Sequence, residues 1–376
     1  MRIMTVLGTR PEIIRLSLLI PLLDEHVEHT LVHTGQNSDD RLSSVFFREL
    51  GVRDPDTNLG VREASFGAQV GAILAKIEPI LLDRRPDRVL VLGDTNSGLV
   101  AIVARRLGIP VCHMEAGNRC YDDRVPEEVN RRIIDHASSV LLPYTERSRA
   151  NLLREGIPSE RVYVTGNPIR EVLDRHAPAI ASSRVLEDLG LAERRFFLVT
   201  MHRAENVDRE DKLRSLIDAL GLVQREFGLP VICSLHPRTK SKVEQFGVEL
   251  DTPGLRFVPP LGFFDFVHLE RAARCVLSDS GTVQEETCIL GVPNVTLREV
   301  TERPETIECG SNMLAGTDPA SILDAVTFVL NRGGSWTPPP EYQATHVAQT
   351  VFRIVTGHQM ADAAELEWRQ GLRTRG

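Results

Sequence analysis

The stretch of sequence that decides the fold is residues 2–23, RIMTVLGTRPEIIRLSLLIPLL. Its apolar run Ile3–Leu7 is typical of a short strand buried on both faces of a parallel sheet. Gly8 permits a tight turn after the run, and Pro11 suits the first turn of a helix, which the pattern predicts over Glu12–Leu23. A buried strand that turns directly into a helix predicts the start of a βαβ unit.

The alternation of strand and helix continues along the first half of the chain. Further buried strands are expected at Thr30–His33, Arg88–Leu92, Pro110–Met114 and Val140–Leu142. Helices are expected between them at Phe66–Leu82, Ser97–Leu107 and Glu127–His136. This order is typical of a parallel sheet with helical crossovers.

The same pattern restarts after a polar, helix-rich stretch at 170–193. Strands are expected at Phe196–Thr200, Val231–Leu235, Leu255–Val258, Cys275–Leu277 and Asn294–Leu297. Helices are expected at Asp211–Phe227, Thr239–Val248, Phe263–Ala272, Thr282–Leu290, Pro319–Asn331 and Tyr342–Val355. The sequence therefore predicts an α/β chain of two Rossmann-like, doubly wound domains at 1–168 and 169–340, followed by a helix and tail at 341–376.

Composition excludes several classes of protein. A length of 376 residues suits about two domains, and 42% hydrophobic with 26% charged residues is near the average of globular proteins. The 44 Lys and Arg against 52 Asp and Glu give a net charge of −8, so the chain has no general basic field for a polyanion. Aromatic residues make up only 5%, which also argues against stacking on single-stranded nucleic acid. We expect no nucleic-acid partner.

Cysteine spacing and apolar runs indicate the compartment. The six cysteines are widely spaced without a C-x-x-C pair, which favours free thiols in a reducing cytoplasm. The apolar N-terminal run ends at Gly8, well short of a signal peptide or a membrane span, so no membrane partner is expected. Metal binding is disfavoured because H-E-x-x-H, His-x-His and an Asp-rich loop are all absent from the sequence.

Charged residues follow the predicted strands of the first half, where ligands of parallel sheets bind. Arg10 and Arg15 follow the first strand and add positive charge near a helix start that can bind an anion. Asp94 and Glu115 each end a later strand, and Glu127 opens a helix, where an acid also has a plain helix-dipole explanation. Neither G-x-G-x-x-G nor G-x-x-x-x-G-K-[ST] is present, which disfavours NAD and nucleoside triphosphate binding.

The second half carries a complementary set of polar residues. His202-Arg203 and His236 end two predicted strands, a placement that favours recognition of a diphosphate or proton transfer. The turn 278–286, SDSGTVQEE, leads a strand into a helix and offers hydroxyls and free amides to a phosphate. Its Glu286 either accepts ribose hydroxyls or caps the helix, and Arg303 follows the next strand.

Seven motifs together resemble one known family. They are GTRPE at 8–12, GDT at 93–95, EAG at 115–117, PEE-x-NR at 126–131, HR-x-EN at 202–206, DSG-x-x-QEE at 279–286 and TERPE at 301–305. Their order and spacing are similar to those of the non-hydrolysing UDP-N-acetylglucosamine 2-epimerases, from Arg2 to about Gly316. Seven motifs in register are far more specific than any one of them.

The resemblance implies the GT-B arrangement, two Rossmann-like domains facing across a cleft, with the C-terminal helix returning to the first domain. It implies an isomerase that interconverts UDP-GlcNAc and UDP-ManNAc without a cofactor. In that family UDP is eliminated to give 2-acetamidoglucal and is added back after a proton returns to the other face. The family also suggests a homodimer. One group must remove a weakly acidic ring proton and another must deliver it.

The resemblance assigns roles to the residues by motif. The implied catalytic residues are Asp94, Glu115, Glu127 and His202, of which the three carboxylates are the acid and base candidates and His202 sits at the departing diphosphate. The implied substrate-binding residues are Arg10, Arg15, His202, Arg203, His236, Phe266, Ser280, Gly281, Thr282, Glu286 and Arg303, with Glu286 on the ribose. Which carboxylate serves which face stays open.

Three departures from the family pattern bear on the substrate and on regulation. Ala204 replaces a residue that is usually charged, so any contact of that side chain is lost. Residues 35–40, GQNSDD, replace the usual GQHREM, a region associated with allosteric activation by UDP-GlcNAc. The loop 115–122, EAGNRCYD, together with 35–37 resembles the branch that forms UDP-N-acetyl-L-fucosamine from a 6-deoxy sugar nucleotide. The substrate is therefore left open between UDP-GlcNAc and a 6-deoxy UDP-sugar.

Three other functions are compatible with parts of this pattern. A GT-B glycosyltransferase would bind a nucleotide sugar with the same fold but needs no carboxylates on both faces of the ring. A hydrolysing epimerase would release free ManNAc, and a nucleotide-sugar sensor would be inactive. The set Asp94, Glu115 and Glu127 favours the non-hydrolysing epimerase.

Overall fold

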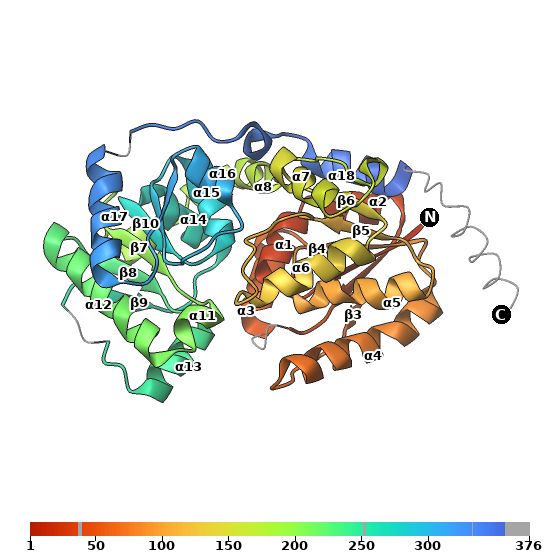
Figure 1. Cartoon of the computed structure of the whole chain (residues 1–376), viewed down its shortest axis with the longest axis horizontal. Helices are drawn as coiled ribbons and strands as arrows, with labels where there is room; N and C mark the ends of the chain where they lie inside the picture. Colours follow the sequence, from red (N-terminus) through yellow and green to blue (C-terminus); the bar gives the residue numbers. More distant parts are fainter. Residues whose placement is uncertain (37–39, 251–252, 333, 358–376) are drawn as a thin grey trace, which may run out of the picture. The chain divides into compact units, whose positions relative to one another are not determined.

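The computed structural model describes residues 1–36, 40–250, 253–332 and 334–357, without the side chains of 40–43. The chain forms two compact units, Met1–Val172 with the chain from Ala344 onward, and Leu173–Gln343 (Figure 1). Each unit has its own six-stranded parallel sheet. The predicted domain boundaries at 168 and 340 stay predictions.

The sheet of the first unit has the order β3-β2-β1-β4-β5-β6. Its strands are β1 Arg2–Leu7, β2 Glu28–His33, β3 Thr57–Asn58, β4 Arg88–Leu92, β5 Val111–Met114 and β6 Val140–Leu142. Every pairing is parallel, with β1 between β2 and β4. All the carboxyl ends therefore lie along one edge of the sheet, which is where the predicted site residues of this unit begin.

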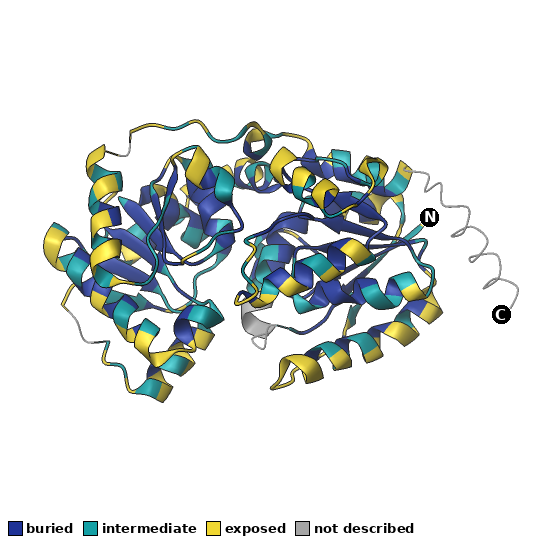
Figure 2. Cartoon of the chain, viewed as in Figure 1, coloured by how far each residue is buried: buried dark blue, intermediate teal, exposed yellow. Residues whose placement is uncertain are grey.

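Helices cover the faces of this sheet (Figure 1). They are α1 Arg10–Leu16, α2 Leu19–His26, α3 Asp40–Glu49, α4 Phe66–Arg84, η1 Asn96–Leu99, α5 Val100–Arg106, α6 Pro126–Ala137, α7 Glu146–Arg154, η2 Ser159–Arg161 and α18 Val347–Gly357. Figure 2 shows the strands buried and the outward faces of the helices exposed. Met4, Val6, Val89 and Val91 belong to the core between sheet and helices. Burial of these apolar strands is the main stabilising contribution to the unit.

The first helix differs from the prediction of one continuous helix over Glu12–Leu23. The structure has two helices, α1 and α2, separated at Ser17 and Leu18. Pro21 explains the break, because its nitrogen has no hydrogen to donate and its ring collides with the carbonyl four residues earlier. The hydroxyl of Ser17 donates a hydrogen bond to the Ile14 carbonyl (2.7 Å), which also accepts from the Ser17 amide (3.3 Å), and the two bonds close the end of α1.

The sheet of the second unit has the order β12-β11-β10-β7-β8-β9. Its strands are β7 Phe197–Thr200, β8 Val231–Ser234, β9 Leu255–Val258, β10 Cys275–Ser278, β11 Asn294–Thr296 and β12 Asn312–Leu314. The helices are α9 Ala177–Ala181, α10 Val185–Asp188, α11 Ala204–Val207, α12 Glu210–Phe227, α13 Pro237–Phe246, α14 Phe263–Ala272, α15 Gly281–Leu290, α16 Pro304–Glu308, α17 Pro319–Arg332 and η3 Pro340–Gln343. The strand order again matches a doubly wound sheet.

The end of the described chain packs on the first unit. Helix α8, Ile169–Arg175, precedes the second unit, and α18 contacts α2. The guanidinium of Arg88 donates hydrogen bonds to the carbonyls of Ile354 and Val355 at the end of α18. The predicted helix Tyr342–Val355 begins later than expected, because His346 has a left-handed backbone (φ 68°) that an α-helix excludes. None of the helices in the described residues is long and apolar enough to cross a membrane.

Candidate functional site

In the first unit, the end of β5 places Glu115 beside Arg15 of α1. Arg15 Nη1 lies 3.0 Å from Glu115 Oε2, and the two residues are only 4% and 7% exposed. Glu115 has φ 64°, a left-handed backbone that is costly for a residue with a side chain. Such strain persists where the surroundings hold it, and it is common at functional sites. The structure thus joins two of the predicted residues in one buried ion pair.

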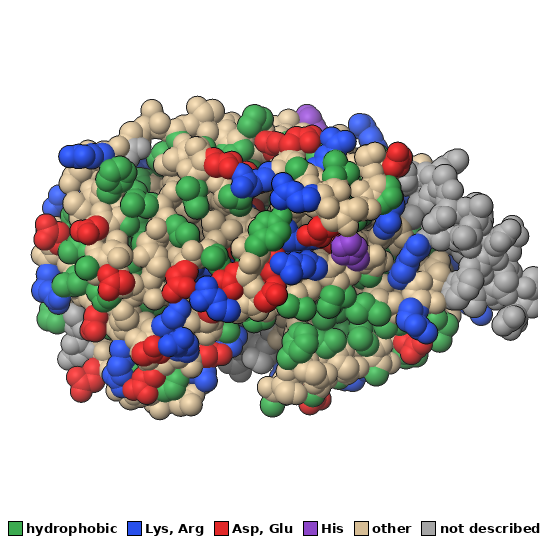
Figure 3. Space-filling view, in the orientation of Figure 1, with side chains coloured by type: hydrophobic (Ala, Val, Ile, Leu, Met, Phe, Trp, Pro, Cys, Tyr) green, Lys and Arg blue, Asp and Glu red, His purple; other side chains and the backbone are tan. Residues whose placement is uncertain are grey.

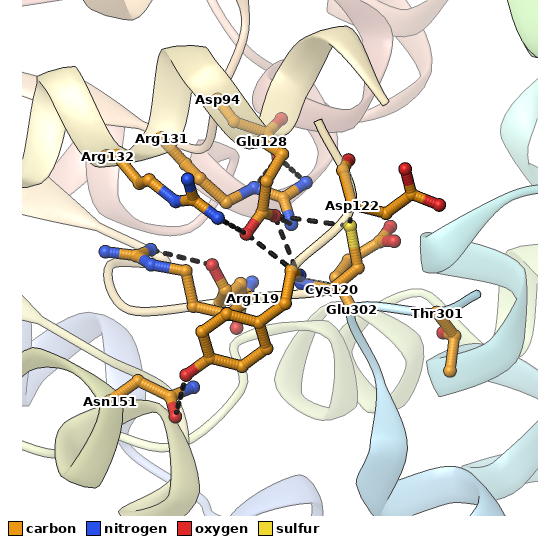
Figure 4. Close-up of polar contacts among 12 residues, drawn as sticks. Asp94, Arg119, Cys120, Asp122, Glu128, Arg131, Arg132, Asn151, Thr301 and Glu302 are labelled. Atoms are coloured by element: carbon orange, nitrogen blue, oxygen red, sulfur yellow. Dashed lines mark hydrogen bonds and ion pairs between the residues drawn. The ribbon is translucent and has the colours of Figure 1, made fainter. Parts of the chain in front are cut away.

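Asp94, after β4, is held by Arg131 of α6. Arg131 Nη2 and Nε lie 2.5 Å and 3.0 Å from Asp94 Oδ2. The same guanidinium donates to Glu128 Oε2 (3.0 Å), and Figure 4 shows the three side chains converging between α6 and the neighbouring loops. Asn130 also donates to the Asp94 carbonyl (3.1 Å). Asp94 is half-buried, so its carboxylate is positioned without being fully enclosed.

Glu128 and Glu127 are neighbours in the first turn of α6 and differ in environment. Glu128 is fully buried and accepts hydrogen bonds from the backbone amides of Cys120 and Tyr121, each at 3.0 Å. It therefore fixes the loop that follows Glu115. Glu127 is half-buried, and its predicted role in proton transfer stays a prediction.

Glu12 is a buried acid that we did not select from the sequence, although it lies within the GTRPE motif. It is 1% exposed and accepts hydrogen bonds from the Gly8 amide (3.0 Å), the Thr9 hydroxyl (2.7 Å) and the Thr95 hydroxyl (3.1 Å). Burial raises the pKa of Glu12 to about 7, in spite of these donors. Glu12 joins the loop after β1 to the loop that carries Asp94. Arg10, at the start of α1, lies over the Phe46 ring.

A second buried acid, Asp135 of α6, supports β5 and the loop that follows it. It accepts from His113 Nδ1 (2.8 Å) and Arg119 Nη1 (2.8 Å), and from the Gly117 amide (3.2 Å). Burial alone would raise its pKa, but the hydrogen bond from His113 and the charge of Arg119 outweigh burial and lower the pKa of Asp135. Gly117 is required in this loop, because it has φ +82° and a Cβ there would lie 2.3 Å from the Ser148 carbonyl oxygen.

In the second unit, Asp279 at the end of β10 holds the loop that follows β7. It is fully buried, and it accepts from the backbone amides of His202 (3.0 Å) and Arg203 (3.0 Å) and from Asn206 Nδ2 (3.1 Å). Burial raises the pKa of Asp279, opposed by these donors. The rings of His202 and His236 lie side by side, with centroids 5.4 Å apart. Asp279 lies in the DSG-x-x-QEE motif, but the motif does not predict its supporting role.

The turn into α15 and the TERPE loop are bound together. Ser280 is the N-cap of α15, and its hydroxyl lies 3.3 Å from that of Thr282. Gly281 allows close approach, since a Cβ there would lie 2.6 Å from Glu302 Oε1. Arg303 is buried and forms an ion pair with Glu285. The predicted phosphate-binding residues and Arg303 thus belong to one connected set in this unit.

Glu286 and Phe266 lie on neighbouring helices of the second unit, α15 and α14. Glu286 is 3% exposed and neighbours Glu270 of α14, which is fully buried. Burial, together with the nearby charge of Glu286, raises the pKa of Glu270. Phe266 is half-buried and packs against the core cluster that contains Leu269 and Val283. The predicted contacts of Glu286 and Phe266 with substrate stay predictions.

Two further expectations concern the loop after β2 and metals. Of the segment 35–40 that departs from the family pattern, residues 37–39 lie outside the described residues. Gln36 is described, and its side-chain carbonyl accepts from the Ser97 amide (3.3 Å) and hydroxyl (3.2 Å). Within the described residues, no group of three or more His, Cys, Asp and Glu side chains is arranged to hold a metal ion.

Two doubly wound units, each with charged side chains at the carboxyl edge of its sheet, define a class of α/β protein that binds charged ligands beyond its strand ends. A family model described as UDP-N-acetylglucosamine 2-epimerase matches residues 22–356. The chain belongs to the UDP-N-acetylglucosamine 2-epimerase family. The family resemblance and the two Rossmann-like units predicted from the sequence are confirmed.

Named relatives are similar over nearly the whole chain. The UDP-N-acetylglucosamine 2-epimerase of Methanocaldococcus jannaschii is 39% identical over 370 residues, which are 95% of this chain and 99% of that protein. The UDP-2,3-diacetamido-2,3-dideoxy-D-glucuronate 2-epimerase of Pseudomonas aeruginosa is 36% identical over 336 residues, 88% of this chain and 93% of that protein. The structure of the Methanocaldococcus jannaschii UDP-GlcNAc 2-epimerase in complex with UDP-GlcNAc and UDP has a TM-score of 0.90 at 38% identity, covering 95% of this chain and 100% of that chain.

Proposed function

We propose that this protein is a non-hydrolysing UDP-N-acetylglucosamine 2-epimerase, an isomerase that interconverts UDP-GlcNAc and UDP-ManNAc without a cofactor. The observation that carries the proposal is the near full-length similarity to the Methanocaldococcus jannaschii enzyme of that name. The proposal is supported by residue types that such a reaction needs, acids with buried supports in the first unit and arginines, hydroxyls and a helix start in the second. The two relatives named above are both described as 2-epimerases and give no support to a glycosyltransferase.

In the proposed reaction, a carboxylate removes the proton from the ring carbon that carries the N-acetyl group, and the bond between the anomeric carbon and the UDP oxygen breaks. The products of this step are 2-acetamidoglucal and UDP. UDP is then added back after a proton reaches the opposite face. Asp94, Glu115 and Glu127 are the proposed acid and base groups. The ion pairs of Asp94 with Arg131 and of Glu115 with Arg15 hold two of these carboxylates in fixed positions.

UDP is proposed to bind to the second unit. The start of α15 offers free amides and the hydroxyls of Ser280 and Thr282 to a phosphate. The cationic side chains add electrostatic stabilisation of the departing diphosphate. Glu286 is proposed to accept the ribose hydroxyls. Two residues of the first unit complete the proposed substrate-binding set, which is Arg10, Arg15, His202, Arg203, His236, Phe266, Ser280, Gly281, Thr282, Glu286 and Arg303.

The substrate class is proposed to be UDP-2-acetamido sugars, with UDP-GlcNAc first. The Pseudomonas aeruginosa relative, which is named for a diacetamido-glucuronate, is similar over most of this chain. The sugars for which members of this family are named therefore differ at other ring positions, although the proteins share the name 2-epimerase. Neither of the two relatives named above is named for a 6-deoxy sugar. The alternative that this protein epimerises a 6-deoxy UDP-sugar therefore gains no support from them.

We further propose a cytoplasmic homodimer. All six cysteines are free, as expected in a reducing compartment. Figure 3 shows hydrophobic side chains gathered over α4 and α5 of the first unit. Helix α4 also carries two large exposed apolar side chains, Phe66 and Leu82. An exposed apolar face of this kind is typical of a surface that packs against another protein. The proposed homodimer is tested by analytical ultracentrifugation of the full chain, which measures its mass in solution. A monomeric mass would contradict the proposal.

The proposed reaction is tested by incubating the purified protein with UDP-GlcNAc or with UDP-ManNAc and separating the products by ion-exchange chromatography. The expected result is one common mixture of the two UDP-sugars reached from either side, without free sugar. Release of free ManNAc would instead indicate a hydrolysing enzyme. An unchanged substrate in both directions would contradict the proposal.

A further inference from the structure

Two cysteines of the second unit lie together at the ends of neighbouring helices. Cys288 is in α15 and Cys309 directly follows α16, and their sulfur atoms are 3.7 Å apart. Three other cysteines, Cys112, Cys233 and Cys275, are buried within strands of the two sheets. Only the pair Cys288 and Cys309 brings two thiols into contact among the described residues.

The two thiols differ in access and in ionisation. Cys288 is fully buried, whereas Cys309 is half-buried between the exposed residues Glu308 and Gly310. A hydrogen bond from the Cys288 thiol lowers the pKa of Cys309, and the Ser311 hydroxyl, 3.4 Å from its sulfur, acts in the same direction. The same interaction raises the pKa of Cys288. Because the thiolate is the nucleophile in thiol chemistry, Cys309 is the attacking sulfur and Cys288 the resolving one.

We propose that Cys309 and Cys288 form a dithiol exchange site that reacts with a low-molecular-weight disulfide, such as glutathione disulfide, to give an intramolecular disulfide. The Cys309 thiolate attacks one sulfur of the small disulfide, whose S–S bond breaks and releases a first small thiolate. The Cys288 thiol loses its proton, and its sulfur attacks the Cys309 sulfur of the mixed disulfide and releases the second small thiol. Two protein thiols are oxidised and one small disulfide is reduced to two thiols.

The disulfide between Cys288 and Cys309 would affect the position of the segment that carries Arg303. Arg303 immediately precedes α16 and pairs with Glu285, which lies one turn before Cys288 on α15. A disulfide requires the two sulfur atoms to approach from 3.7 Å to about 2.05 Å and fixes the end of α15 to the end of α16. The disulfide is therefore expected to weaken UDP binding. This last step rests on the proposed function, whereas formation of the disulfide does not.

The exchange is tested on the full chain in glutathione redox buffers, with free thiols trapped by alkylation and peptides analysed by mass spectrometry. The wild-type protein should lose two alkylatable thiols and yield a peptide pair linked through Cys288 and Cys309, reversed by excess thiol. C288S should stop at a mixed disulfide on Cys309, and C309S should form neither product. C120S is the matched control and should behave as wild type, since Cys120 contacts Glu128 and not a thiol.

Two results would overturn the exchange site: thiols that all stay free in the oxidising buffer, or a mixed disulfide on Cys309 that wild-type protein never resolves. UDP binding is then measured by calorimetry on the oxidised and reduced proteins. Binding should be weaker by roughly fivefold or more after oxidation. Equal affinity would overturn the effect on Arg303. Failure of the reduced wild-type protein to bind UDP would contradict the proposed function and leave the exchange result standing.

Discussion

Arg15 Nη1 lies 3.0 Å from Glu115 Oε2, and this ion pair is almost completely buried at the carboxyl edge of the first sheet. Glu115 is also held in a left-handed backbone conformation, with φ 64°. A buried pair is weak support for stability, because desolvation offsets the attraction between the charges. The cost of burying this ion pair and the strained backbone of Glu115 are better explained by the proposed proton transfer, which needs a carboxylate in a fixed position.

Glu115→Gln is expected to remove most of the turnover, because the amide can neither take up nor deliver the ring proton. The loss should be roughly 10²–10⁴-fold in kcat. UDP affinity should fall far less than turnover, since most of the proposed substrate-binding residues lie in the second unit. Kinetics and calorimetry measure the two effects. Glu160→Gln, an exposed site, is the matched control, and normal turnover of Glu115→Gln would remove Glu115 from the mechanism.

Glu12 is expected to make stability depend on pH. Its pKa is about 7 in the folded protein, above the ordinary value of 4.5, so the folded state binds the proton more tightly than the unfolded state. Stability contributed by this group is therefore highest below about pH 4.5 and falls as pH rises to about 7, by about 3 kcal/mol at most.

The measurement for Glu12 is the urea midpoint of unfolding at several pH values, for wild type and Glu12→Gln. The Gln variant should lack the part of the decline that lies between about pH 4.5 and pH 7. Glu25→Gln, at an exposed position of α2, controls for the change in net charge. Parallel pH curves for wild type and Glu12→Gln would contradict the proposed ionisation.

Arg303→Ala is expected to weaken UDP binding and to destabilise the second unit. The first effect follows from loss of a proposed phosphate ligand. The second follows because Glu285 would be left buried without its ion-pair partner, at a cost of about 3–5 kcal/mol. Calorimetry with UDP and thermal unfolding measure the two effects separately. Unchanged UDP affinity in a folded Arg303→Ala protein would exclude Arg303 from the binding set.

Glu270 is expected to be neutral at physiological pH. Burial, the charge of Glu286 and a side-chain hydrogen bond with Glu286 all raise its pKa. Glu270→Gln should therefore change the unfolding free energy little, within about 1 kcal/mol, and should reduce the loss of stability at high pH. A large loss of stability in Glu270→Gln at neutral pH would show that the group is ionised instead.

The sequence predicts both sheets well, because buried parallel strands are short apolar runs that are read directly. It misses β3, which has only two residues, and β12, where Asn312 is a polar residue in the sheet. The side chain of Asn312 accepts from Asn294 Nδ2 (2.7 Å) and from the Thr296 hydroxyl (2.8 Å) on the neighbouring strand. These polar contacts between strands satisfy the buried groups, so the strand lacks the apolar pattern that would identify it.

The supporting residues of the site are harder to predict than its charged residues. Asp94 and Glu115 follow strands, and that position alone suggests a function. Glu12, Asp135 and Asp279 have roles that depend on partners distant in the chain, such as Thr95, Arg119 and His202. A sequence pattern does not reveal which distant groups meet, so these three acids could be recognised only from the structure.

The central claim is 2-epimerisation through elimination and re-addition of UDP. It is tested most directly by proton NMR of the purified protein with UDP-GlcNAc in deuterated water. We predict the anomeric signal of UDP-ManNAc together with loss of the signal from the proton beside the N-acetyl group, because that proton exchanges with solvent. A spectrum in which UDP-GlcNAc keeps that proton and no UDP-ManNAc appears would contradict the account.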